Sequence, residues 1–339
     1  MRASFLNTDQ RQLISIVAPV FNEEAVLPEF HQTVSETLSD LPFDFEIVYI
    51  NDGSKDNTLS IIKQLRQTDQ RITLIDLSRN FGKEIALTAG LQNAAGDAVV
   101  VIDADLQDPP ELIPELIREW QNGYDVVYAQ RTHRSGESLL KRSTAHFFYR
   151  IIQRVNKVTI PEDTGDFRIL SRRAVNALNS FGEQHRFMKG LFAWIGYRQK
   201  AVHYQREPRH AGKTKWSYWR LWNLALDGIT SFTIAPLKIS TYLGLATATG
   251  AFAYGIYMVI DTLLHGNPVP GYPSLIVIIL ILGGVQLVAI GILGEYLGRI
   301  FNETKHRPLY FINEYLPGSK ASSRQPENKN TTGHQTHQQ

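Results

Sequence analysis

Between residues 13 and 130 the chain alternates short apolar runs with segments of helical period. The apolar runs are LISIVAPV, FEIVYIND, RITLIDLS, DAVVVIDAD and DVVYAQ, and helices are predicted to begin near Glu24, Asn57, Gly82 and Pro110. Strands that are apolar throughout are typical of parallel sheets with helices on both faces. The pattern therefore predicts an α/β domain of the doubly wound type, with a mostly parallel sheet.

Three of these predicted strands end in polar residues, in the stretches PVFNEE, INDGSKDN and DADLQDPP. In open parallel sheets, ligands bind beyond the carboxyl ends of the strands. We therefore expect the three polar ends to line one crevice.

The stretch VVVIDADLQDPP places three carboxylates within six positions. Asp103 and Asp105 are two residues apart, so both can point the same way from a strand end, and Gln107 continues the spacing. Crowded carboxylates repel one another unless a cation lies among them. Carboxylate and amide oxygens suit Mg²⁺ or Mn²⁺, which keep sites for water and substrate phosphates. A solvated loop with helix-capping aspartates is the alternative, strongest for Asp108 before PPEL.

Two long apolar segments lie near the C-terminus, ISTYLGLATATGAFAYGIYMVI and SLIVIILILGGVQLVAIGIL. Both approach the roughly 20 residues that a helix needs to cross a bilayer, so we predict two transmembrane helices. A pair of buried core helices is the alternative, and it is stronger for the first segment. The Gly, Ala and Thr residues of that segment are also typical of helix-packing faces, which would permit a homo-oligomer.

The charges around these segments predict their orientation. The connecting stretch DTLLHGNPVPGYP has no Lys or Arg, whereas Lys238, Arg299, Lys305 and Arg307 flank the outer ends. By the positive-inside rule, both flanks and the large N-terminal domain face the cytoplasm, which predicts a multi-pass protein of the inner (plasma) membrane.

Five regions follow from these patterns. They are a large cytoplasmic domain (1–215), an amphipathic interfacial helix (216–235), two transmembrane helices (236–300), a cytoplasmic return segment (301–316) and a disordered tail (317–339). The interfacial helix carries Trp216, Trp219 and Trp222 at helical spacing, and core packing is its alternative interpretation. The tail lacks any apolar period.

Composition narrows the classes of function. The 339 residues allow one large domain with an appendage. The net charge of +2 gives no field that would favour a nucleic-acid partner. The chain has no cysteine, which excludes disulfides, thiolate metal sites and cysteine nucleophiles. Its ten histidines show no metal-binding spacing such as HExxH, so none is assigned a role.

Longer motifs carry a resemblance to a known family. They are IVAPVFNEE, VYINDGSKDNT, LSRNFGKEIALTAGL, IDADLQDPPELIPEL, TGDFRILSRRAV, REPRHAGKTKW and LGEYLGRIFNETKHRPLYFI. In this order they resemble the glycosyltransferase family 2 enzymes that glycosylate polyprenyl phosphates. The resemblance runs from about Leu13 to Tyr315 and implies a GT-A fold. It also implies inverting, metal-dependent transfer of a hexose from a nucleotide-diphosphate sugar to a membrane polyprenyl phosphate, for later glycosylation of the cell envelope.

The resemblance implies roles for particular residues on the donor side. Pro19, Phe21, Glu23 and Asp52 would bind the nucleotide, although the family often has Tyr where this chain has Phe21. Asp103 would lie near the donor, and Asp105 and Gln107 would hold Mg²⁺ or Mn²⁺ on its diphosphate. Asp166 matches the position of a catalytic or sugar-binding aspartate. Because a phosphate nucleophile is already largely ionised at pH 7, we favour an orienting role for Asp166 over proton abstraction.

Basic residues complete the implied site. Arg131 and Arg142 match positions that bind the acceptor phosphate, and a planar guanidinium suits phosphate oxygens. Arg209 and Lys215 match a basic loop that folds over the donor phosphates. A solvated basic turn is the alternative for this loop.

Two other classes of protein compete with this interpretation. A processive polysaccharide synthase shares the aspartates but carries a QxxRW motif, and this chain has no Arg-Trp pair. A non-catalytic scaffold or lipid flippase would not need Asp103, Asp105 and Gln107 together. The sequence leaves the sugar open: UDP-glucose comes first by resemblance, ahead of other UDP-sugars and GDP-mannose.

Overall fold

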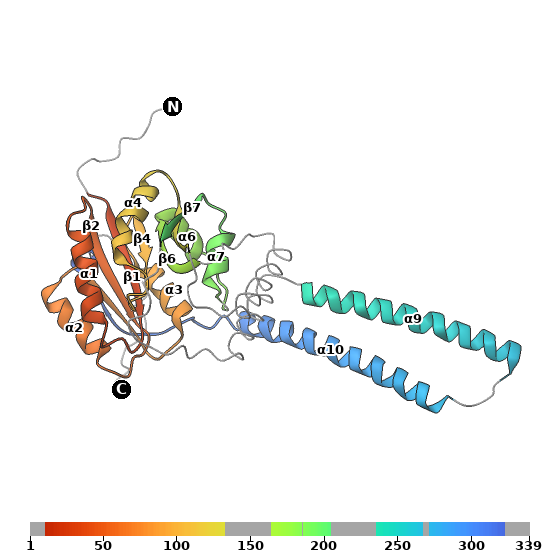
Figure 1. The fold of residues 1–339 in the computed structure, drawn as a ribbon. Coiled ribbons are helices and arrows are strands. Elements are labelled where there is room, and N and C mark those ends of the chain that lie inside the picture. Colours follow the sequence, from red (N-terminus) through yellow and green to blue (C-terminus); the bar gives the residue numbers. More distant parts are fainter. Residues whose placement is uncertain (1–10, 133–163, 185, 205–234, 267–270, 323–339) are drawn as a thin grey trace, which may run out of the picture. The chain divides into compact units, whose positions relative to one another are not determined.

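The computed structural model describes residues 11–132, 164–184, 186–204, 235–266 and 271–322. These residues fall into two compact units (Figure 1). The first takes the described parts of 1–144, 158–215 and 308–339, and the second takes those of 145–157 and 216–307. The second unit is thus inserted, along the sequence, into the first.

The first unit is built on one eight-stranded sheet with the order β7-β5-β6-β4-β1-β2-β3-β8. Neighbours pair in parallel at β1–β2, β1–β4, β2–β3 and β5–β7, and antiparallel at β4–β6, β5–β6 and β3–β8. The strands are β1 (Leu13–Val20), β2 (Asp44–Asn51), β3 (Ile72–Leu77), β4 (Ala98–Val101), β5 (Val126–Arg131), β6 (Thr164–Ser171), β7 (Gln199–Tyr204) and β8 (Ile312–Leu316). The predicted mostly parallel sheet is confirmed.

Helices cover both faces of this sheet (Figure 1). They are α1 (Leu27–Ser39), α2 (Thr58–Thr68), α3 (Lys83–Asn93), α4 (Ile113–Gln121), α6 (Arg172–Asn179), α7 (Met188–Trp194) and the short α11 (Ser319–Ser322). Helices α1, α2 and α4 share a core with the face that carries Ile14 and Ile16. Helix α3 lies on the opposite face, so closely that a side chain on Gly90 would clash with Val17 and Ile50. The doubly wound arrangement predicted from the sequence is therefore present.

The segment after residue 301 differs from the prediction of a simple return segment and tail. Strand β8 pairs with β3 and extends the sheet, and the Gly318 N–H donates to Thr73 Oγ1 at 2.9 Å. Ala321 is fully buried. The prediction of a disordered tail from Pro317 is therefore wrong for residues 317–322.

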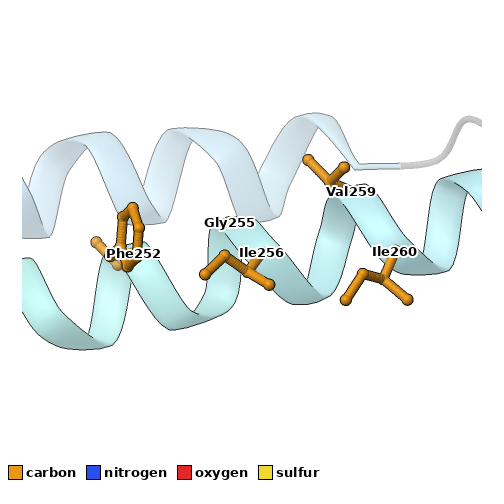
Figure 2. Close-up of a pocket in the computed structure, with 6 residues that line it drawn as sticks. Phe252, Gly255, Ile256, Val259 and Ile260 are labelled. Atoms are coloured by element: carbon orange, nitrogen blue, oxygen red, sulfur yellow. The ribbon is translucent and has the colours of Figure 1, made fainter.

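The part of the second unit that the structure describes consists of two long helices in contact with each other, α9 (Ala235–His265) and α10 (Tyr272–Thr304). Both are long and apolar enough to cross a membrane. Their described side chains are exposed or half-buried, which contradicts the alternative of buried core helices. Figure 2 shows a shallow apolar pocket on α9, lined by Ala251, Phe252, Gly255, Ile256, Val259 and Ile260. The predicted interfacial helix with its three tryptophans lies outside the described residues.

Candidate active site

The three polar strand ends, which were predicted to line one crevice, lie side by side at one edge of the sheet. Strands β4, β1 and β2 are neighbours and run parallel, so their carboxyl ends lie side by side. The loops after β1 and β2 are joined by hydrogen bonds, from the Glu23 N–H to Thr58 Oγ1 (2.9 Å) and from the Lys55 N–H to Asn22 Oδ1 (2.8 Å). Burial raises the pKa of Glu23, and the charges of Asp105 and Asp103 raise it further. The carboxylates of this edge thus act on one another.

The residues predicted to bind the nucleotide lie at the ends of β1 and β2. Pro19 is half-buried in β1, and Phe21 follows the strand with 41% of its surface exposed. Asp52 is only 3% exposed, and its carboxylate accepts the N–H groups of Phe81 (2.7 Å) and Gly82 (2.9 Å). Burial raises the pKa of Asp52, and these two amide donors oppose the rise. Asp52 therefore fixes the loop that leads into α3.

Gly53 allows this loop to approach the end of β2. Its φ of +64° lies in the left-handed region, and an added Cβ would lie 2.5 Å from backbone atoms of Arg79 and Asn80. A side chain at this position would therefore push the loop away from Asp52.

Lys83 connects the carboxylates at the ends of β4 and β6. Its Nζ lies 2.7 Å from Asp103 Oδ2 and also donates to Asp166 Oδ2. The antiparallel register pairs Val101, the last residue of β4, with Arg168, so the residues just after β4 lie near the start of β6. Lys83 was not among the residues predicted from the sequence, although a cation was expected among the crowded carboxylates.

The pKa values of the two carboxylates that Lys83 bridges shift in opposite directions. Burial raises the pKa of Asp103, and the charge of Lys83 opposes this rise. Burial also acts to raise the pKa of Asp166, but the charges of Lys83 and Lys189 outweigh it and lower that pKa. Asp166 Oδ1 is buried and has no hydrogen-bond partner among the described residues. Asp166 is thus an ionised acceptor with one oxygen unused by those residues.

Asp105 and Gln107 fit the predicted metal, although strand geometry is not what brings them together. β4 ends at Val101, and a turn with Leu106 at φ +55° carries both residues, so that the Gln107 N–H donates to Asp105 Oδ1 at 3.1 Å. Both side chains are half-buried and offer the hard oxygen donors that Mg²⁺ and Mn²⁺ prefer. Among the described residues, no group of three His, Cys, Asp or Glu side chains has metal-binding geometry. Such a metal would take further ligands from a substrate diphosphate or water.

Asp108 and Arg131 form a separate cluster with Tyr204. Asp108 is not the helix cap of the alternative interpretation, because it is buried and accepts Arg131 Nη2 (3.3 Å) and the Tyr204 hydroxyl. Arg131 Nε also donates to Tyr204 Oη at 3.1 Å. Burial and the charge of Asp108 raise the pKa of Tyr204 to about 12, so Tyr204 stays a hydroxyl donor. Arg131 is thereby held beside Gly165, whose added Cβ would lie 3.5 Å from Arg131 Nη2.

Two further residues that interact with Asp166, Arg168 and Glu84, were not predicted from the sequence. Arg168 is buried over the Phe192 ring and donates to the carbonyl oxygens of Gly165 (2.8 Å) and Asp166 (3.2 Å). Burial, together with the charge of Asp166, raises the pKa of Glu84 to about 7. The remaining predicted site residues, Arg142, Arg209 and Lys215, lie outside the described residues.

Comparison with known proteins identifies the family. The model of glycosyl transferase family 2 matches residues 15–178, and that of the GtrB C-terminal hairpin matches residues 235–300. The bactoprenol glucosyl transferase of Shigella phage SfV is 53% identical, over 88% of this chain and 97% of that protein. An uncharacterized glycosyltransferase of Synechocystis is 52% identical, over 91% of this chain and 98% of that protein. The chain therefore belongs to glycosyl transferase family 2.

Proposed function

We propose that this glycosyltransferase moves glucose from UDP-glucose to a polyprenyl phosphate, with inversion at the anomeric carbon. The observation that carries the proposal is the identity of 53% to a bactoprenol glucosyl transferase, which covers 88% of the chain. That extent takes in both the sheet domain and the apolar hairpin. A scaffold without catalysis would not explain the cluster of Asp103, Lys83 and Asp166.

The reaction needs positioning more than it needs a base. An oxygen of the lipid phosphate attacks C1 of the sugar, the bond from C1 to the diphosphate oxygen breaks, and its electron pair leaves with UDP. A phosphate monoester has a second pKa of about 6, so the attacking oxygen is ionised at neutral pH. Burial acts to raise the pKa of Asp166, but the charge of Lys83 helps to lower it overall. With a lowered pKa, this carboxylate is a weak base and a good hydrogen-bond acceptor for sugar hydroxyls.

Charge on the leaving diphosphate requires compensation. Mg²⁺ or Mn²⁺, bound with the help of Asp105 and Gln107, would supply Lewis-acid stabilisation of the diphosphate. Arg209 and Lys215 keep their predicted role on the donor phosphates. Pro19, Phe21, Glu23 and Asp52 keep theirs around the nucleotide, where the joined loops after β1 and β2 support a shared binding surface.

The acceptor places the reaction at a membrane. A polyprenyl chain stays in the bilayer, and the two apolar helices are long enough to span one. With the charge distribution around the hairpin, this supports a catalytic domain on the cytoplasmic face of the inner membrane. Arg131 and Arg142 would bind the acceptor phosphate there, and the Asp108 and Tyr204 contacts to Arg131 support this role.

Radiolabelled UDP-glucose incubated with membranes that contain the protein tests the function. We expect label in a lipid phosphate that is extractable into organic solvent, and none with membranes that lack the protein. A labelled polymer would indicate a processive synthase. Label in neither product, with other nucleotide sugars also inactive, would contradict a glycosyltransferase that uses a lipid acceptor.

Replacing Arg131 with Ala should separate the acceptor from the donor. Loss of a charge-assisted contact to phosphate should raise the apparent KM for the lipid by about 10-fold to 100-fold. The Kd for UDP should stay within about threefold. Tyr204→Phe, which removes the hydroxyl that holds Arg131, should raise the same KM by a smaller factor. Arg118→Ala, which removes an exposed arginine paired with Glu115, is the control. If the Kd for UDP rises by the same factor as the KM for the lipid, Arg131 lies on the donor side instead.

A further inference from the structure

The position of Lys83 is electrostatically unfavourable for its helix, so its ion pairs need an explanation. Lys83 is the first residue of α3, where the helix dipole favours negative charge and disfavours a lysine. Gly82, before it, has a φ of +97° and provides no side-chain cap. The backbone here is held by Asp52 through the N–H groups of Phe81 and Gly82. The loop thus projects Lys83 from a fixed point on the nucleotide side.

The Lys83 ammonium holds together two carboxylates that would otherwise repel each other. It contacts Asp103 Oδ2 at 2.7 Å and Asp166 Oδ2. These contacts use two of the three N–H donors of a lysine. The Asp166 side chain is 9% exposed, while that of Lys83 is 44% exposed. The bridge therefore lies at the rim of the site and fixes a carboxylate that is deeper inside.

The contacts of Asp166 hold its backbone and its Oδ2 atom but leave Oδ1 without a partner among the described residues. Lys83 occupies Oδ2, and Arg168 holds the carbonyl oxygens of Gly165 and Asp166. Oδ1 is buried and has no partner among the described residues. Buried carboxylate oxygens are almost always hydrogen-bonded, so an acceptor without a partner in a pre-ordered site points to a ligand that donates a hydrogen bond.

We infer that Lys83 is a positioning residue, which holds Asp166 Oδ2 against Asp103 and so directs Oδ1 to a hydroxyl of the donor hexose. This inference rests on the proposed function. It adds Lys83 as a residue that contributes to sugar recognition by positioning Asp166. Two simpler roles compete with it. Lys83 could only neutralise nearby acids, or it could bind the donor diphosphate directly.

Binding of UDP and UDP-glucose to the full-length protein separates these roles. UDP has the diphosphate but no hexose. For Lys83→Met we expect the Kd for UDP to change by less than about threefold, while the extra affinity for UDP-glucose is lost. The kcat/KM for UDP-glucose should fall by about 100-fold, the scale of a lost charged contact in an active site. Lys83→Arg, whose guanidinium can also bridge two carboxylates, should recover at least about a tenth of the activity.

Two comparisons make the test specific to positioning. Lys189→Met removes a charge that also lowers the pKa of Asp166 but leaves the bridge to Asp103 intact. If Lys83 only neutralises nearby acids, Lys83→Met and Lys189→Met should lower the kcat/KM for UDP-glucose by similar factors. If Lys83 positions Asp166, Lys189→Met should lower it by no more than about threefold. In the double variant with Asp166→Asn, the Lys83→Met loss should largely disappear, because Lys83 acts through Asp166.

Several results would overturn the inference. Equal weakening of UDP and UDP-glucose binding by Lys83→Met would place the ammonium on the diphosphate. Additive losses in the double variant would show that Lys83 acts independently of Asp166. If Lys83→Met does not fold, the same measurements are made on Lys83→Arg. A kcat/KM for UDP-glucose below about a tenth of that of the unaltered protein would then count against positioning. Failure of the proposed function is recognised separately, as absence of labelled lipid with the unaltered protein.

Discussion

Replacing Asp105 with Asn should lower turnover by at least about 100-fold, the scale of losing a main electrostatic stabiliser of the leaving group. Excess EDTA should abolish the activity of the unaltered protein, and Mn²⁺ or Mg²⁺ should restore it. The physical reason is the turn at Leu106, which carries both Asp105 and Gln107 and holds them together through the hydrogen bond from the Gln107 N–H to Asp105 Oδ1. An amide at position 105 keeps the shape of the side chain but removes the negative charge.

A matched control separates the effect of losing a charge at position 105 from the effect of losing any carboxylate charge in the protein. Asp40→Asn makes the same change on an exposed aspartate just after α1, and it should leave turnover within about twofold. The measurement is initial transfer rate with labelled donor, at fixed lipid acceptor, over a range of metal concentrations. Full activity in EDTA, or an unchanged rate in Asp105→Asn, would remove the metal assignment.

The sequence predicted the central part of the fold well because its signals are local. Each strand from β1 to β5 is a dense apolar run, and each strand end carries its own polar residues. Parallel pairing then brings these ends to one edge, wherever the chain adopts the doubly wound order. Asp103 and Asp105 could therefore be named as candidates before any coordinates, whereas Asp166, near the start of the antiparallel strand β6, was named only through the family resemblance.

The features that were missed depend on contacts between distant residues. Strand β8 has only the five residues INEYL, and the Gly318 contact to Thr73 joins positions 245 residues apart. A lysine at the start of a helix gives no sign that it faces two carboxylates, so Lys83 was not identified. Asp108 before PPEL matches a helix cap locally, yet the fold brings Arg131 and Tyr204 against it. Register and long-range packing, which decide these cases, cannot be found in a short motif.

The return of the chain to the sheet changes how the hairpin should be tested. Truncation after residue 235 would remove the spans but also β8, and with it the Asn313 contact to Asp76 at 2.8 Å. It would leave β3 as an unpaired edge, and such edges favour aggregation. The informative variant instead joins residues 1–235 to residues 308–339 through a flexible Gly/Ser linker, which keeps β8 and α11.

We expect this hairpin-deleted protein to bind UDP with nearly normal affinity but to transfer poorly to long-chain polyprenyl phosphate in bilayers. Removing a polyprenyl chain from the membrane costs about 0.8 kcal/mol for each buried CH₂ group, so the acceptor cannot come to a soluble enzyme. Transfer to the long-chain lipid should fall by at least about 10-fold. Transfer to a short, water-soluble prenyl phosphate should fall much less, because that acceptor reaches the site by diffusion.

The ratio of the two transfer rates is the measurement that decides the role of α9 and α10. It cancels any general loss of activity caused by the linker, since both acceptors use the same catalytic residues. A loss shared equally by both acceptors would mean that the deletion damaged the catalytic unit. An undiminished rate with the long-chain lipid would show that the catalytic unit finds the membrane without the hairpin. In that case the apolar surface of α9, with Gly255 at its centre, would be better explained by assembly between copies than by delivery of the active site to its acceptor.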